Sequence, residues 1–567
     1  MSAHSRFLLP ALVCLVALPT VAVQPFTSVV GGGEAFDNSQ ESLGLRYLVR
    51  LASDDFDDLG EVGLFAAREQ YLPSGWVEAA GQTLDISSNQ SLFSKLGTRF
   101  GGDGEQTFKL PDLRGRTAIG AGSGPGLPTY AVGDAVGQEQ VTLTIDQIPS
   151  HTHALGGGYA AGAAGGGMSH SNLQPSLALT PIIAVSGNYP SRNLIDPGVG
   201  GQAEAAAIGI GGGDPYLSEL SWIAHHQVPD GWMIADGSIL PINNNAALFS
   251  LLGTEFGGDG RTNFALPDLR GRAAVGANGF QQVGLKGGEH DEALTLSQLP
   301  AHDHELPSGG TTGPTGTGQP QSNRQPTLGL TTVVALTGVY PSAPATSEVG
   351  EEGDTPPIGE IGTGSEPSLG SITRFGASFA PRGFAYASGQ DLDISSNTAL
   401  FSLFAELDGG GFTTLYGDNG SSRFDLPNLE DRLAVGAGAG VGLVNRQQGE
   451  QFGAEESALT VANLPEHSHL ISVPGDYNNN GVVDAADYTV WRDNVGQPAG
   501  TLPNDEDGGD IGPAQYDTWA ANYGLPGFTP PPSTAVPEPS AVGLAMLGLI
   551  GLSRTTRRPD RTPAPAR

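Results

Sequence analysis

Hydrophobic residues fall in short stretches along most of the chain, and glycine-rich turns separate these stretches. Residues 141–145 alternate apolar and polar positions, as a half-buried strand does. Residues 90–96 have the spacing of a short helix, and residues 86–89 before them can cap its first turn. Apolar runs at 182–185 and 333–336 indicate one further strand each. The pattern predicts mainly β structure with occasional short helices.

Glycine and proline support this prediction. The 567 residues include 85 glycines and 42 prolines, which weaken helix interiors and favour tight turns. These proportions argue against a long helical bundle and stay below those of collagen-like or fully disordered chains. The length suggests about three to four domains.

One sequence unit occurs three times. The string Leu-Pro-Asp-Leu-Arg-Gly-Arg fills residues 110–116 and 266–272, and a decayed copy fills residues 426–432. Each unit also holds Pro-x-Gly-Trp or Pro-x-Gly-Phe and closes with Pro-x-His-x-His. The spacing far exceeds a solenoid period, so the units are predicted to be tandem domains. The predicted ranges are 59–155, 218–306 and 369–471 for the modules, 156–217 and 307–368 for glycine-rich linkers with a strand element, and 23–58 for an N-terminal segment of unclear structure.

A shorter element follows the first two units. Gln-Pro-Ser-Leu at 174–177 and Gln-Pro-Thr-Leu at 325–328 each precede an apolar run. No such element follows the third unit, which continues directly into the next domain.

These motifs resemble the phage tail collar domain and the bacterial microcystin-dependent proteins. The resemblance implies a mainly β multidomain fold of three tandem collar-like β-rich modules, each with a short helix. It also implies structure and attachment rather than turnover, because family members on phages build trimeric fibre tips that contact host surfaces. For Asp112 with Arg116, and Asp268 with Arg272, we expect a turn closed by a local ion pair.

Each module ends in two histidines separated by one residue. In an extended strand such residues point to the same face, so a pair can present two imidazoles to one metal ion, for which zinc, iron or nickel is suited. The three pairs could ring a single ion within one chain, or the repeats could trimerise between chains, as in phage fibres of similar pattern. Alternatively, each pair hydrogen-bonds a turn or faces solvent. The six candidate ligands are His151, His153, His302, His304, His467 and His469.

Residues 475–524 begin with the spacing of a calcium-binding loop. Gly481 occupies position 6, where such a loop turns sharply, and a helix with Tyr488 and Trp491 follows. The pattern resembles one half of a type I dockerin, so a small α-helical, EF-hand-like segment is predicted. The expected calcium ligands are Asp476, Asn478, Asn480, Val482 through its carbonyl, Asp484 and Asp487.

A second, degraded half follows. Residues 516–524 echo residues 488–496, but the aligned ligand positions hold Asn504, Glu506, Gly508, Gly512 and Gln515. We expect one good calcium site and a second helix kept for packing. Dockerins bind cohesins in polysaccharide-degrading assemblies, which makes a cohesin-like protein one candidate partner; the alternative is that calcium simply folds the segment.

The N-terminus resembles a secretory signal. Arg6 precedes an apolar run at 7–18, and small residues follow it, so residues 1–22 are predicted to be a signal peptide. Its removal takes away Cys14, the one cysteine, and with it every disulfide and thiol site.

The C-terminus resembles a PEP-CTERM sorting signal, which implies an exosortase-type enzyme as partner. A proline-rich linker at 525–536 precedes the signal at 537–558, and residues 559–567 form a tail. The apolar run at 541–552 spans about 18 Å as a helix, short of the roughly 30 Å bilayer core, so it is predicted to anchor the chain transiently or permanently. The residues expected to carry the signal are Pro537, Glu538, Pro539, Arg557 and Arg558.

The net charge and the absence of several catalytic motifs reduce the number of functions that the sequence supports. The formal net charge of -34 repels phosphate backbones, which argues against nucleic-acid binding. The sequence has no Gly-x-Ser-x-Gly elbow, no His-Glu-x-x-His and no phosphate-binding loop. The leading interpretation is an exported, non-catalytic structural or adhesive surface protein with a surface glycan as candidate ligand. An accessory subunit of a polysaccharide-degrading assembly is the second, and a hydrolase working through unrecognised carboxylates is the third.

Overall fold

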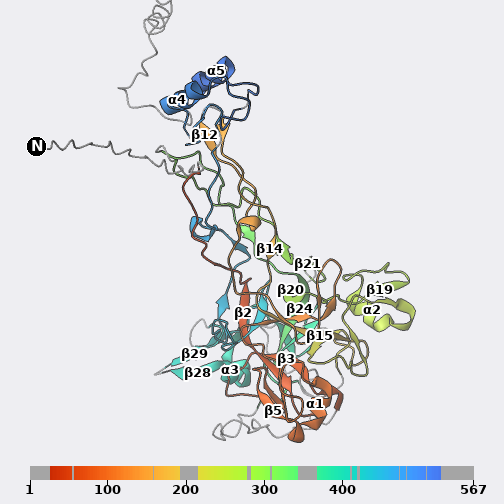
Figure 1. Ribbon diagram of the computed structural model, residues 1–567. Coiled ribbons are helices and arrows are strands. Elements are labelled where there is room, and N and C mark those ends of the chain that lie inside the picture. The colour runs from red at the N-terminus through yellow and green to blue at the C-terminus, as the bar shows by residue number, and fades with distance from the viewer. Residues whose placement is uncertain are drawn as a thin grey trace, which may run out of the picture.

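The computed structural model describes residues 26–524 apart from 54–55, 74, 157–158, 192–214, 278–282, 307–309, 342–366, 409–410, 418–421, 472, 481 and 506. The described chain is mainly β, as predicted. Figure 1 shows a broad head, with short helices at its edge, from which a narrow stalk extends to a helical pair at the far end.

Each repeat contributes the same set of elements to the head. A nine-residue strand, a following antiparallel strand and a later parallel strand form the core of each set. The long strands are β2 (Ser42–Arg50), β15 (Ser176–Ala184) and β24 (Thr327–Ala335); their antiparallel partners are β3 (Glu61–Phe65), β16 (Glu219–Ile223) and β25 (Ser371–Phe375); the parallel strands are β7 (Thr117–Gly120), β20 (Ala273–Ala277) and β31 (Leu433–Gly436).

Smaller elements repeat in the same way. Each long strand also pairs with a three-residue strand, and a short hairpin flanks the helix of each repeat. The three-residue strands are β4 (Trp76–Glu78), β17 (Trp232–Ile234) and β26 (Phe384–Tyr386); the hairpins are β5 (Thr83–Asp85) with β6 (Thr107–Lys109), β18 (Ile239–Pro241) with β19 (Asn263–Ala265), and β27 (Asp391–Asp393) with β30 (Arg423–Asp425); the helices are α1 (Gln90–Leu96), α2 (Ala246–Leu252) and α3 (Thr398–Phe404). The helix expected at 90–96 is therefore confirmed.

The three repeats share one sheet. Strand β3 pairs with β16, β16 with β25, and β25 with β3, so the strands close a triangle. The buried residues of all three repeats accordingly form one hydrophobic cluster. The repeats are therefore not separate domains joined by linkers. They pack around a common axis with approximate threefold symmetry.

The N-terminal segment completes this symmetry, and its structure differs from what the sequence indicated. Strand β2 lies within the range of unclear pattern, yet it pairs in parallel with β31 of the third repeat. In the same way β15 pairs with β7 of the first repeat and β24 with β20 of the second. The third repeat does possess the element that seemed missing after it: the beginning of the chain supplies it.

The glycine-rich ranges beside the histidine pairs also differ from the expected flexible linkers. Residues 159–167 and 310–319 run back along the stalk and pair with the chain at His151 and His302. The stalk continues toward the head through three equivalent strand pairs. These are β1 (Phe36–Asp37) with β11 (Gln140–Val141), β14 (His170–Ser171) with β22 (Asp291–Glu292), and β23 (Gln321–Ser322) with β33 (Glu456–Ser457).

Two local expectations were wrong. The strand expected at 141–145 ends at Val141, because Thr144 caps a 3-10 turn at Ile145–Gln147. The turn aspartates pair with the first arginine of the motif rather than the second: Arg114 binds Asp112 at 2.8 Å, and Arg270 binds Asp268 at 2.9 Å. The first arginine is only two residues from the aspartate, so the bond closes within the turn.

A buried carboxyl in the head gives a pH prediction. Burial raises the pKa of Glu219 to about 8, and nearby Glu61 adds to the rise, although the backbone N–H of Tyr216 donates to Glu219 at 3.0 Å. Between about pH 4.5 and 8 the folded chain keeps a proton that the unfolded chain has lost, so this group lowers the free energy of unfolding as the pH rises. Glu219→Gln is expected to raise the unfolding temperature at about pH 9 and to have less effect at about pH 5, measured by scanning calorimetry. Equal shifts at both pH values, or a matching shift from Glu69→Gln at an exposed site, would contradict this.

Candidate metal centre

The three histidine pairs meet on the axis of the stalk. Each pair lies on an extended segment held by backbone hydrogen bonds to a return segment. His151 N–H donates to Ala164 O at 2.8 Å, and His302 N–H to Thr315 O at 3.0 Å. The third pair has no return segment of its own, and His467 N–H donates to Val30 O at 2.9 Å instead. The N-terminal segment therefore builds one third of the histidine cluster.

Every Nδ1 atom of the six rings contacts a backbone carbonyl. Because a carbonyl only accepts, each Nδ1 must carry the proton, and each Nε2 is left with a free lone pair. The first histidine of each pair bonds within its own repeat, and the second bonds across to a neighbouring segment. The contacts are His151 to Pro149 O, His302 to Pro300 O and His467 to Pro465 O, each at 3.0 Å, and His153 to Gly313 O at 2.9 Å, His304 to Ser28 O at 2.7 Å and His469 to Gly162 O at 2.7 Å.

The six Nε2 atoms face one another in a small space. Those of His151, His302 and His467 form a triangle with sides of 3.2, 3.3 and 3.3 Å. Those of His153, His304 and His469 are buried and have no hydrogen-bond partner in the described chain. Two lone pairs cannot hydrogen-bond each other, so the triangle is repulsive unless a cation lies among these atoms.

Four of the six histidines are held in the neutral form that binds metals. Burial lowers the pKa of His151, His304 and His469 to about 4 and that of His153 to about 3, although the carbonyl contacts oppose this. The neighbouring imidazoles lower these pKa values further, because several cations cannot share the cage. At neutral pH these four rings are uncharged nitrogen donors.

This arrangement fits a transition metal. Two nitrogens bound at right angles to one ion lie about 3 Å apart, since each metal–nitrogen bond is about 2.1 Å long, and the triangle has nearly these dimensions. Four triads of histidines, which together use all six rings, each have their ligand atoms within 4.8 Å of one another, and one of them takes a ring from each pair. The structure thus brings together the six residues that the sequence singled out, within one chain, while the bound ion stays a prediction.

A polar ring below the cage joins the same three segments. The backbone N–H of Gln40 donates to Gln174 Oε1 at 2.9 Å, that of Gln174 to Gln325 Oε1 at 3.1 Å, and that of Gln325 to Gln40 Oε1 at 3.1 Å. All three side chains are buried. Each glutamine therefore fixes the segment of the next repeat, and Gln40 is an equal member of the ring.

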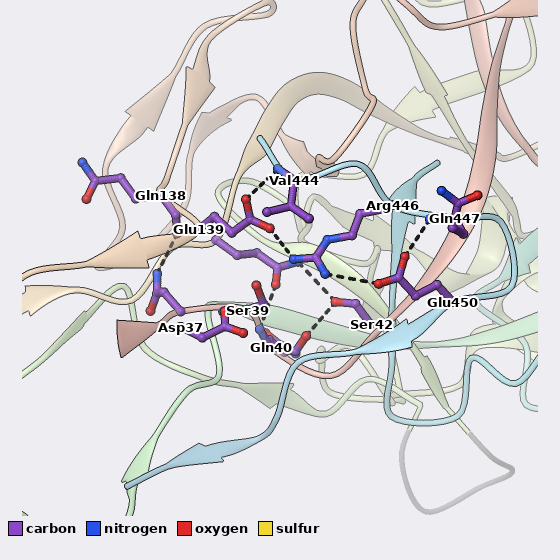
Figure 2. A network of polar contacts seen from close by, with 12 residues as sticks. Asp37, Ser39, Gln40, Ser42, Gln138, Glu139, Val444, Arg446, Gln447 and Glu450 are labelled. Carbon is purple, nitrogen blue, oxygen red and sulfur yellow. Dashed lines mark hydrogen bonds and ion pairs between the residues drawn. The ribbon is translucent and has the colours of Figure 1, made fainter. Parts of the chain in front are cut away.

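An ion pair joins the first and third repeats beside the N-terminal segment. Figure 2 shows Arg446 pairing with Glu139 and with Glu450, beside Asp37 to Ser42. Arg446 also stacks on Phe452, its guanidinium carbon 3.7 Å from the ring centroid. The equivalent of Glu139 in the second repeat is His290, which contacts the hydroxyl of Tyr130 at 2.9 Å instead. The interfaces between repeats are thus chemically different from one another.

The sequence reasoning missed the contribution of the N-terminal segment. Ser28 supplies the carbonyl for His304, and Thr27 Oγ1 accepts from the backbone N–H of His469 at 2.9 Å. A usable signal was present. The Gly-x-Gly of residues 31–33 recurs at 165–167 and 316–318, and the Asn-x-Gln of 38–40 recurs at 172–174 and 323–325.

The predicted calcium loop lies at the far end of the stalk. Its side chains turn inward: the backbone N–H of Asn478 donates to Asp487 at 2.8 Å, and that of Asn480 donates to Asp476 at 3.0 Å. Asp476 and Asp487 are fully buried, and burial raises the pKa of Asp487 to about 7, with a smaller rise from Asp476 and Asp484. Crowded buried carboxylates favour a bound cation, although calcium itself stays a prediction. Gly481 lies outside the described residues.

Two helices follow the two halves of this segment in a reciprocal arrangement. Trp491 of α4 (Ala485–Asn494) donates through its indole N–H to Gly512 O at 2.9 Å, and Trp519 of α5 (Pro513–Asn522) donates to Asp484 O at 2.7 Å. The helix predicted for packing in the second half is therefore present.

The second loop is closed by a side-chain amide. Gln515 stands where Asp487 stands in the first loop, because each caps the helix after its own loop. Its Nε2 donates to both carboxylate oxygens of Asp505, at 3.3 and 3.4 Å, and to Gly508 O at 3.2 Å. An amide donor thus satisfies oxygens that a calcium ion would otherwise bind.

We therefore expect the chain to bind one calcium ion in this segment. Asp487→Asn should abolish binding, because it removes a charged ligand of the first loop, whereas Gln515→Ala should leave the stoichiometry at one. Isothermal titration calorimetry of the calcium-depleted protein measures both. Two bound ions, or binding that survives Asp487→Asn, would show that the ligands were assigned to the wrong loop.

The predicted targeting signals fall outside this part of the chain. The signal peptide at 1–22 and the sorting residues Pro537, Glu538, Pro539, Arg557 and Arg558 all lie beyond the described residues. Within the described ranges, no helix is long and apolar enough to cross a membrane.

Comparison with known families supports the repeat assignment. Residues 60–118, 219–274 and 370–434 each match the family model of the Phage Tail Collar Domain. The three matches cover less than half of the chain, and they lie in the head. No curated protein and no solved structure matches the chain. The head is thus made of three modules similar to a domain of phage-tail structural proteins, whereas the dockerin-like and sorting assignments stay predictions.

Proposed function

We propose that this protein is an exported, non-catalytic structural or adhesive protein that displays a fibre-tip-like body at the cell surface. The observation that carries this proposal is the closure of three collar-like modules of one chain around one axis, which ends in the six-histidine cage. Phage fibres of similar pattern use three chains for such a body. Here a single chain provides the symmetry, so the tip can be displayed from one attachment point.

The histidine cage supports a structural metal as part of this function. All six nitrogen donors come from the protein, so the site leaves no open position for a substrate, as structural rather than catalytic sites do. Zinc in structural sites is almost always four-coordinate, so six imidazoles favour iron or nickel over zinc. When bound, the ion would supply crosslinks among the three repeats.

The targeting patterns of the sequence support the location. A signal peptide would export the chain, and the sorting signal would hold it at the membrane or pass it to the surface through an exosortase-type enzyme. The acidic net charge keeps such a protein soluble and away from nucleic acids.

The proposal is tested by labelling intact cells with an antibody against the head, together with binding of purified protein to surface glycans. Labelling without permeabilisation and glycan binding without release of reducing sugars are the expected results. Labelling only after permeabilisation would contradict the location. Release of reducing sugars would replace the adhesive role with a hydrolase.

A further inference from the structure

The end of the stalk beyond the histidine cage is apolar. Leu155, Leu306 and Ile471 each follow the second histidine of a pair by two residues, so all three emerge at the same level. They are between 0% and 7% exposed, although they lie at the end of a narrow stalk. The dockerin-like segment covers them, as Figure 1 shows for α4 and α5 beside β12 (Ala154–Gly156). One hydrophobic cluster joins the two parts; its members are Leu155, Ala161, Leu306, Ile471, Val473, Tyr477, Val483, Leu502, Ile511 and Trp519.

The connection between the stalk and this segment is short and packed. Only six residues separate His469 from Asp476, and Val473 among them is fully buried. The side chain of Asn522, at the end of α5, donates to Pro474 O at 2.9 Å. Gly475 lies so close to α5 that an added Cβ would be 3.0 Å from Trp519 Cα. The dockerin-like segment therefore packs directly against the stalk tip through a short, buried connection.

The first calcium loop shares its backbone with the residues that cover the tip. Tyr477 follows the ligand Asp476, and its hydroxyl donates to Gln515 O at 2.6 Å. Val483 precedes the ligand Asp484 and is fully buried. A change in the loop backbone must therefore move two members of the hydrophobic cluster that joins the segment to the stalk.

We propose that the stalk tip is a docking surface for the calcium-loaded dockerin-like segment of the same chain, and that calcium holds this segment as a cap over the histidine cage. The inference rests on the calcium site and the structural metal of the proposed function. Without a cation, the carboxylates of Asp476, Asp484 and Asp487 repel one another, and the loop opens. The cap then loses the fixed positions of Tyr477 and Val483. Calcium binding and docking are linked, so each strengthens the other by the same factor.

Hydrogen exchange of the full chain tests this inference, with calcium present and after its removal by EGTA. The expected result is faster exchange in residues 476–523 and also at the tip, in residues 153–164, 302–315 and 467–473. Faster exchange confined to residues 476–523 would overturn the cap while leaving the calcium site intact. Calorimetry on the same sample reports calcium binding separately, and absence of binding would overturn both the site and the cap. Because EGTA also chelates transition metals, the metal content of the histidine cage is measured before and after EGTA, and calcium is then added back alone: faster exchange at the tip that calcium alone does not reverse would overturn the cap.

Substitutions at the tip give the reverse test. Leu306→Asp should weaken calcium affinity at least fivefold, because a charge in the apolar contact opposes docking. Leu306→Ala should weaken it less, and it provides a milder variant if the aspartate disturbs the stalk. Val441→Asp is the matched control, since Val441 is 84% exposed on the head. Unchanged calcium affinity in both Leu306 variants would overturn the coupling.

Discussion

Replacing His302 and His304 with alanine is expected to abolish binding of the transition metal and to lower the unfolding temperature. The two rings belong to one pair, so the change removes a third of the donors and leaves the other four rings around an open space. Among those four, His153 and His469 keep Nε2 atoms that are buried and have no hydrogen-bond partner within the described residues. A metal present at a thousand times its dissociation constant stabilises the folded state by about 4 kcal/mol. For a chain of this size we expect its loss to lower the unfolding temperature by roughly 5 °C.

Elemental analysis and scanning calorimetry measure the two effects. His226→Ala is the matched control, because His226 is an exposed histidine of the head. Chelation of the unaltered protein should reproduce the shift in unfolding temperature, and iron or nickel should reverse it. Unaltered protein that takes up neither ion after chelation would refute a structural metal. A shift in the double variant that chelation does not reproduce would mean that the rings act by packing alone.

The sequence predicted the parts of the fold whose signal is local. The short helix at 90–96 follows from its own spacing, although the Asn89 side chain before it makes no capping hydrogen bond, and the collar-like units follow from strings that recur three times. The histidine pairs could be singled out for the same reason, because each lies at one fixed position of a repeated motif. Their convergence was one of several alternatives, since spacing alone does not decide whether copies associate within or between chains.

The sequence did not predict how the ring closes. The contact of Val30 with His467 joins residues at opposite ends of the described chain, and no local pattern reports such a pairing. The N-terminal segment serves the third repeat as residues 159–167 and 310–319 serve the first two, but it precedes the first repeat in the sequence. Only two copies of this element therefore follow a repeat, although the structure has three. Ser28 need not match its counterparts Gly162 and Gly313, because the atom that contacts the histidine ring is the backbone carbonyl in all three cases. A role carried by the backbone leaves no mark in side-chain identity.

Removal of residues 26–33 is expected to open the third repeat and to empty the histidine cage. The deletion removes the backbone bonds between Val30 and His467 and between Thr27 and His469. It also takes away the carbonyl of Ser28, so His304 loses the contact that fixes its tautomer. We expect no bound transition metal and a lower unfolding temperature, measured as for the histidine variants. Addition of a synthetic peptide of residues 26–33 should restore metal binding, because the open edge pairs with an extended strand.

Substitutions at two glycines of the N-terminal segment distinguish a loss of strand pairing from a general loss of stability. Gly31 and Gly33 both have positive φ, 109° and 62°; alanine costs about 1–2 kcal/mol in backbone strain at Gly33, which lies in the left-handed α region, and more at Gly31, which lies outside it. Their surroundings differ: a Cβ on Gly31 would lie 2.4 Å from Pro465 O, whereas a Cβ on Gly33 would meet nothing within 4 Å. Because Pro465 precedes His467 by two residues, Gly31→Ala must push the strand away from the cage, and Gly33→Ala need not. Gly31→Ala should therefore lower metal occupancy and the unfolding temperature more than Gly33→Ala does. Overpacking of the close contact is expected to reduce the free energy of unfolding by about 1–3 kcal/mol more in Gly31→Ala. Equal effects of the two variants would mean that the N-terminal strand does not hold the histidines in place.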